Sequence, residues 1–182
     1  KNNTYHQFMN AYNNLSEQGI RGLIIDVRDN PGGLLTSVEK IADEIIPEGN
    51  VVYTIDKEGN RKDFNADPNY IDIPMVMLVN GNSASASEIL AGAFQDRGRG
   101  KLVGTQTFGK GLVQNLYKIP DGSAVKITIE KYYTPKGVCI QGIGITPDYI
   151  VENESDLASV QLIPHSEDTQ LIEAVRVLES EM

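Results

Sequence analysis

Histidine, cysteine and tryptophan are scarce in this chain of 182 residues, which holds two His, one Cys and no Trp. A single cysteine cannot form an internal disulfide, and one Cys with two His cannot supply a zinc site of the usual four-ligand kind. A Ser-His-Asp triad is disfavoured as well, because His6 and His165 both lie in polar surroundings near the chain ends. No apolar run approaches ~18 residues, so the sequence predicts no membrane-spanning helix.

Basic residues are also in the minority, with 16 Lys and Arg against 25 Asp and Glu and a net charge of −9. Residues 152–182 hold eight acidic residues and one basic residue, whereas the first 151 residues carry a net charge of only −2. An acidic protein repels phosphate backbones, so nucleic-acid binding is not expected. The length fits one domain that needs no disulfide or metal to fold. Because the chain opens on a polar stretch without Met, we expect a fragment or a processed product.

Strand and helix patterns alternate in the first half of the chain. Apolar runs at 22–27 and 75–79 predict strands buried on both faces, as in a parallel sheet. Helices are predicted over about 4–16 and after Thr36 and Ser85, each opening on a capping box, and over about 168–180. Further strands are predicted at 51–55 with a return strand to 64, and then at 101–103, 112–118, 123–133 and 147–151. This order predicts an α/β domain with a mainly parallel sheet and a β-rich second half.

Serine residues are the first candidates for chemistry, because a base and an oxyanion site can activate them. Ser37-x-x-Lys40 matches the nucleophile motif of penicillin-binding proteins. The chain lacks the Ser-Asp-Asn and Lys-Thr-Gly motifs that accompany it, so Ser37 is interpreted as part of an amphipathic helix. The sequence Gly81-Asn-Ser-Ala-Ser85 fails the G-x-S-x-G elbow pattern at its last position.

Ser85 follows a predicted strand and opens a predicted helix, so two interpretations compete for its hydroxyl. In the first, Ser85 and Glu88 form a capping box and nothing more, and the capping pattern alone favours this interpretation. In the second, the helix N-terminus presents the hydroxyl together with backbone N–H groups that can stabilise an oxyanion. Ser83 could then take over the cap.

A base for Ser85 would have to be a lysine, because neither histidine is placed for it. Lys110 lies in Phe-Gly-Lys-Gly, among small residues that let other backbone come close. Keeping its amine neutral near pH 7 costs roughly 4 kcal/mol, which burial could supply. Residues 104–111 also resemble a phosphate-binding loop, but Gly111 stands where a Mg²⁺-binding hydroxyl is required and a predicted strand follows. Nucleotide binding is therefore not expected.

Four sequence blocks together resemble the C-terminal processing peptidases, the tail-specific serine protease family. They occur in the family's order and cover roughly residues 4–151. The resemblance implies an α/β fold of the crotonase/ClpP-like layered kind and a serine endopeptidase that cleaves proteins near apolar C-terminal tails. The blocks are Gly22-Leu-Ile-Ile-Asp-Val-Arg-Asp-Asn-Pro-Gly-Gly33, then Asn80–Glu88 with Ala91-Gly-Ala93 and Asp96, then Gly104–Gln114, then Tyr133-Thr-Pro135 with Gly142–Asp148.

The resemblance also implies the residues of the site. It makes Ser85 the nucleophile and Lys110 the general base of a dyad that works through an acyl-enzyme, with no metal or cofactor. Gln114 helps to orient the lysine. The backbone N–H groups of Gly33 and Ala86 form the oxyanion hole.

Asp96 matches a family aspartate, but eleven residues along a helix place it about 16 Å from Ser85, which favours a structural role. Family members usually carry a PDZ domain before this core, and these residues show neither that domain nor the strand expected just before Thr4. We therefore expect residues 1–151 to form the peptidase core, with 152–182 as an acidic connection and a C-terminal helix of the same domain.

The resemblance implies partners and a location too. The partners would be polypeptides with apolar C-terminal tails, neither nucleic acids nor nucleotides, and an open sheet edge could support a homodimer. The location would be extracytoplasmic, either periplasmic or at the cell surface, and the full-length protein could be tethered to the membrane. The alternative to a protease is a catalytically silent fragment or a peptide-binding module of the same fold.

Overall fold

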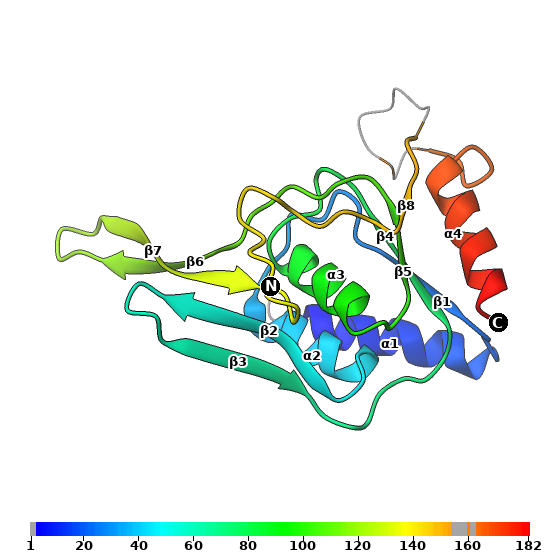
Figure 1. Ribbon diagram of the computed structural model, residues 1–182, viewed down its shortest axis with the longest axis horizontal. Helices are drawn as coiled ribbons and strands as arrows, with labels where there is room; N and C mark the ends of the chain where they lie inside the picture. Colours follow the sequence, from blue (N-terminus) through cyan, green and yellow to red (C-terminus); the bar gives the residue numbers. More distant parts are fainter. Residues whose placement is uncertain (1–2, 154–159, 161–162) are drawn as a thin grey trace.

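Two sheets of opposite character build the protein (Figure 1). The computed structural model describes residues 3–153, 160 and 163–182. Sheet A is parallel, in the order β1 (Leu23–Asp26), β4 (Met75–Val79), β5 (Lys101–Gly104) and β8 (Tyr149–Ile150). Sheet B is antiparallel, in the order β3 (Arg61–Ala66), β2 (Gly49–Asp56), β7 (Ala124–Tyr133) and β6 (Leu112–Lys118). The predicted α/β fold with a parallel sheet and a β-rich second half is confirmed.

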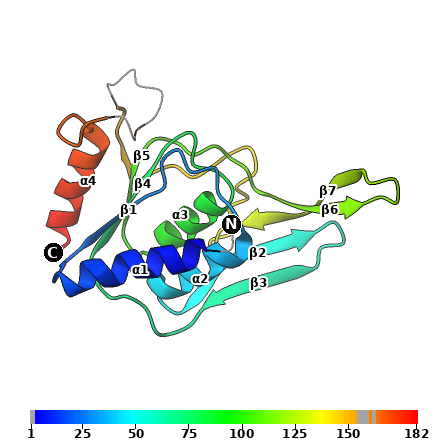
Figure 2. The same cartoon turned by 180° about the vertical axis from the view of Figure 1, so that it is seen from behind.

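Helices cover both faces of sheet A. α4 (Thr169–Ser180) packs on one face, and α3 (Ala86–Asp96) lies on the opposite side with α2 (Leu35–Ile45) and α1 (Thr4–Glu17) beyond it (Figures 1 and 2). The central strand β4 explains this layering, because its alternate side chains enter different cores. Met77 joins the core with α2 and α3, whereas Leu78 packs with Ala174 and Val177 of α4. Among the described residues, no helix has the length and apolar character that crossing a bilayer requires.

The hairpin of β6 and β7 projects from the body of the protein (Figure 1). Only the last residues of β7 pair with β2, so residues 114–128 form a two-stranded ribbon whose residues are all exposed. β6 begins one residue after Gly111, and the ribbon therefore starts beside the loop that carries Lys110.

Two of the three predicted capping boxes are wrong. α1 begins at Thr4 and α2 at Leu35, so Thr4 and Thr36 lie inside helices, and neither N-cap residue makes a side-chain cap hydrogen bond. α2 begins two residues earlier than a Thr36 cap would place it, and its first residue, the apolar Leu35, packs against the core. Much of the predicted acidic connection, residues 154–159 and 161–162, lies outside the described residues.

Candidate active site

Ser85 occupies the sharp turn between β4 and α3. Its backbone angles are φ 57° and ψ −114°, a region that costs a residue other than glycine about 1–3 kcal/mol. A strained serine between a strand and a helix is the geometry of a nucleophile elbow. Comparison with the G-x-S-x-G pattern missed this turn because it centred on Ser83. The Ser83 hydroxyl instead donates to the Val27 carbonyl at 2.7 Å and accepts from the Asn80 N–H at 3.0 Å, so it does not take over the cap.

Glu88 links the Ser85 turn to the Lys110 loop. Its side chain is fully buried and accepts four hydrogen bonds, two on each carboxylate oxygen. Oε1 accepts from the Thr107 hydroxyl at 2.6 Å and from the Gly109 N–H at 2.7 Å. Oε2 accepts from the Ser85 and Lys110 N–H groups, each at 2.8 Å, so these two nitrogens lie no more than twice that distance apart.

Sequence reasoning treated Glu88 only as half of a capping box. That half is formed, since the Glu88 side chain accepts from the Ser85 N–H. The larger role had a detectable signal, because Glu88 is the sole charged residue in the stretch 79–95. A lone carboxylate in an apolar helix needs several donors to be buried.

The turn after β1 approaches Ser85 from the other side. Gly32 has φ +89°, and a Cβ added to it would lie 2.5 Å from the Ala84 carbonyl oxygen and 2.7 Å from the Ala86 nitrogen. Only glycine permits this close approach. The next residue, Gly33, is exposed, and within the part of the chain that the structure describes, neither the Gly33 N–H nor the Ala86 N–H has a hydrogen-bond partner. The two predicted oxyanion donors are thus close in space and unpaired.

The positions of Lys110 and Gln114 agree less well with the predicted roles of general base and orienting residue. The Lys110 side chain is exposed, so the burial expected of a neutral amine is not present in this structure. Its backbone is well held, because Gly109 and Gly111 on either side bond to Glu88 and to the Gln141 side chain. Gln114 is exposed on the ribbon and donates to the Thr128 hydroxyl at 3.2 Å, so the structure pairs it with the neighbouring strand.

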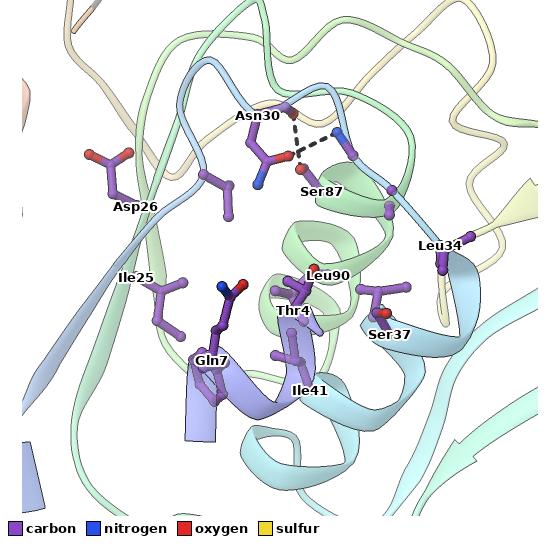
Figure 3. Close-up of a pocket in the computed structure, with 16 residues that line it drawn as sticks. Thr4, Gln7, Ile25, Asp26, Asn30, Leu34, Ser37, Ile41, Ser87 and Leu90 are labelled. Carbon is purple, nitrogen blue, oxygen red and sulfur yellow. Dashed lines mark hydrogen bonds between the residues drawn. The ribbon is translucent and has the colours of Figure 1, made fainter. Parts of the chain in front are cut away.

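A cavity of about 350 Å³ opens beside Gly33 and Ala86. Its walls come from α1, α2, α3 and the end of β1, and Figure 3 places Gln7, Ile41 and Leu90 around it beneath the Asn30 turn. The Asn30 carbonyl accepts from the Ser87 hydroxyl at 3.0 Å, which ties the turn to α3. Most of the lining side chains are apolar, so the cavity suits an apolar group held next to the unpaired N–H groups.

The remaining candidates show no arrangement for chemistry. Ser37 lies within α2 while Lys40 is exposed and places its ammonium 5.6 Å from the Tyr5 ring centre. His6 and His165 are both exposed. Asp96 accepts from the Lys136 N–H at 2.9 Å and so holds the turn that follows β7.

Comparison with known proteins supplies the family. Residues 1–151 match the description of peptidase family S41. The chain belongs to this family. A carboxyl-terminal-processing protease of Synechocystis sp. is 47% identical over 151 residues, which cover 82% of this chain and 35% of the relative. A chloroplastic C-terminal processing peptidase of Tetradesmus obliquus is 42% identical over 181 residues, which cover 98% of this chain and 37% of the relative.

A solved structure of a processing protease has the same fold. The photosystem II D1 C-terminal processing protease superposes with a TM-score of 0.79 at 42% identity, over 85% of this chain and 40% of that chain. The chain therefore spans little more than a third of the length of these relatives.

Proposed function

We propose that this chain is the proteolytic core of a serine endopeptidase that cleaves proteins near their C-terminal tails. Ser85 is the nucleophile and Lys110 the general base. The observation that carries the proposal is the Glu88 carboxylate, whose Oε2 accepts from the N–H groups of both residues. Membership of family S41 supports the reaction class. Residues 1–151 would be the peptidase core, and α4 would belong to the same domain.

The reaction follows from the groups assembled around Ser85. The neutral Lys110 amine takes the hydroxyl proton of Ser85 as Oγ attacks the carbonyl carbon of the substrate. The N–H groups of Gly33 and Ala86, with the positive end of α3 behind them, stabilise the oxyanion. The C–N bond then breaks, and the leaving amine takes the proton from Lys110. A water activated by Lys110 releases the acyl group, and no step needs a metal or cofactor.

Because Lys110 is exposed, the bound substrate itself would have to shield the amine from water. A peptide added as a strand along the outer edge of β6 would run past the Lys110 loop and cover the amine. The Phe108 side chain, 66% exposed beside it, offers apolar surface for the same contact. Removing water from a lysine favours its neutral form, so the bound substrate would complete the base.

The cavity beside the oxyanion donors supports apolar tails as substrates. It would accept the side chain of the residue whose carbonyl is attacked, because Gly33 and Ala86 are among the residues that line it. An extracytoplasmic location of the whole protein belongs to the same proposal and rests on the family. A homodimer would use β1, which is an outer strand of sheet A.

The test is cleavage of a fluorogenic peptide with an apolar C-terminal sequence, together with labelling by a fluorophosphonate. Ser85→Ala and Lys110→Ala should each abolish turnover, and Ser85→Ala should abolish labelling. Ser166→Ala and Lys118→Ala are matched controls at exposed positions and should behave like the parent chain. Persistent cleavage by Ser85→Ala would refute the dyad.

A second candidate function is peptide binding without catalysis. The exposure of Lys110 and the hydrogen bond of Gln114 to Thr128 favour it. In that case the parent chain would bind the peptide, but it would neither cleave it nor react with the fluorophosphonate.

A further inference from the structure

The first residues of the oxyanion turn are tied to the C-terminal helix. Arg28 is the second residue after β1, and its side chain is only 3% exposed. One edge of its guanidinium bonds to Asp26, with distances of 2.7–3.1 Å from Nε and Nη2 to the two carboxylate oxygens. The other edge bonds to Asp168, the N-cap residue of α4, at 2.8 Å from Nη1 to Oδ1 and 2.7 Å from Nη2 to Oδ2.

Asp168 is itself held in place by several groups. It is 3% exposed and accepts the Leu171 N–H at 3.0 Å, which caps α4. Asn153 donates to it at 3.2 Å from the segment after β8. Gln170 accepts from Arg28 Nη1 at 3.0 Å. The ion pair is therefore part of a buried polar network that joins β1, β8 and α4.

From Arg28 the contacts continue to Ser85. The next residue, Asp29, has φ 55° and exchanges hydrogen bonds with the Asn80 side chain, at 3.0 Å from its N–H and 2.9 Å to its carboxylate. Asn30 then accepts from the Ala84 N–H at 3.1 Å through its carbonyl and from the Gly32 N–H at 3.0 Å through its side chain. Hydrogen bonds therefore hold most residues of the segment 28–32, which connects the contact with α4 to the Gly33 N–H.

We propose that Asp168 and Arg28 are positioning residues for the oxyanion site, and that docking of α4 through this ion pair sets the turn that carries Gly33. The proposal rests on the proposed function. Residue 168 lies beyond the span 1–151 that matches the family description, so α4 would complete the site from outside that span. Both side chains of the pair are only 3% exposed, so removing either one would leave the other charge buried without its partner.

A cavity of about 420 Å³ lies beside the pair. Its lining includes Arg28, Asp168, Ile163 and His165. Without the Asp168 carboxylate, the Nη1 edge of Arg28 would lose its charged partner. The guanidinium has room to swing into this cavity toward solvent, and the turn would then lose its anchor on the α4 side.

The experiment compares two substitutions on the same side of the sheet. Asp168→Asn removes the charge that holds Arg28, whereas Val177→Ala loosens the buried packing of α4 without touching Arg28. We expect Asp168→Asn to lower kcat by about 10–100-fold with KM within about threefold, because misplacement of a stabilising group acts on the transition state. Val177→Ala should leave kcat within about twofold, and Asp168→Glu should restore part of the loss.

Amide hydrogen exchange provides a readout that does not depend on turnover. Asp168→Asn should speed exchange in the peptide covering 28–34, and Val177→Ala should not. Equal effects of the two variants on kcat and on this exchange would overturn the proposal. If Asp168→Asn does not fold, Gln170→Ala should lower kcat and speed exchange at 28–34 in the same way, but by smaller amounts. A parent chain that neither cleaves nor labels would refute the proposed function, while the exchange comparison would still decide the positioning role.

Discussion

At the scale of single residues, the Glu88 carboxylate accepts four hydrogen bonds inside the protein. In Glu88→Gln an NH₂ group would face two of these donors in place of an oxygen. We expect a loss of about 3 kcal/mol in the free energy of unfolding, because buried donors would be left unpaired. Turnover should fall by at least about tenfold, since the Ser85 and Lys110 backbones would separate. Urea denaturation and peptide cleavage measure both, with the exposed Glu58→Gln as the control.

Because the backbone of Ser85 is strained, replacing Ser85 with glycine should abolish activity while relieving a cost in stability. Ser85→Gly removes a side chain from a conformation that glycine adopts without penalty. We expect this variant to be inactive and about 1 kcal/mol more stable than Ser85→Ala, which keeps a Cβ in the same strained turn. Thermal unfolding of the two variants makes the comparison. Equal melting temperatures would mean that the turn stores no strain.

The resemblance to a family predicts that Ser85 and Lys110 are neighbours. Local sequence patterns alone do not. A capping box and a glycine-rich loop carry no information about which carboxylate both backbones share. The φ of Ser85 could not be predicted either, because serine is not a residue that signals positive φ. Arg28 and Asp168 stand 140 residues apart, and no short-range pattern connects them.

At the scale of elements, two adjacent glycines in the turn after β1 should respond differently to the same change. A Cβ on Gly32 would overlap the backbone of the Ser85 turn, and its φ of +89° is itself unfavourable. A Cβ on Gly33 meets nothing within 4 Å. We expect Gly32→Ala to destabilise the protein by about 2 kcal/mol or more and Gly33→Ala by less than about 1 kcal/mol. Denaturant midpoints of the two variants test the difference.

The cavity between α1, α2 and α3 predicts a change in specificity. Ile41 lies in its wall, and Ile41→Phe would fill part of its volume. We expect kcat/KM for a peptide with a large apolar residue at the cleaved bond to fall by about 10–100-fold, with little change for alanine at that position. The alanine peptide serves as the internal control. An equal loss for both peptides would place the substrate side chain elsewhere.

Elements were easier to predict from the sequence than their ends and partners. The buried strand 75–79 was predicted with its observed bounds, because an apolar run of that length has few alternatives. The N-cap residues of α1 and α2 were not, because Asn3 and Leu34 stand there in place of the expected threonines. The side of the sheet that α4 covers depends on Val76 and Leu78 facing Ala174 and Val177, which is a tertiary fact.

At the scale of the whole molecule, the junction of α4 with the core should respond to acid. Burial acts to raise the pKa of Asp168, but the hydrogen bonds from Arg28 and the Leu171 N–H outweigh it and lower that pKa below its ordinary value. A carboxyl group with a lowered pKa contributes stability above its unfolded value of about 3.9, and that stability is lost as the pH falls through the folded value.

The corresponding prediction concerns the difference in free energy of unfolding between the parent chain and Asp168→Asn. This difference should be largest above about pH 5 and should narrow below about pH 4. Val177→Ala is the control, because its deficit has no ionisable cause and should stay constant with pH. Denaturant titrations at several pH values measure both, and a constant difference for Asp168→Asn would contradict the ion pair's contribution.

The distance of 140 residues between Arg28 and Asp168 also has a consequence for biosynthesis. A chain leaves the ribosome from its N-terminus at about 5–20 residues per second, so β1, Ser85 and Lys110 all emerge well before residue 168. On the proposed role of α4, the oxyanion turn is not set during this interval. We expect the nascent chain to stay proteolytically silent until that residue appears, which would protect neighbouring unfolded polypeptides from premature cleavage.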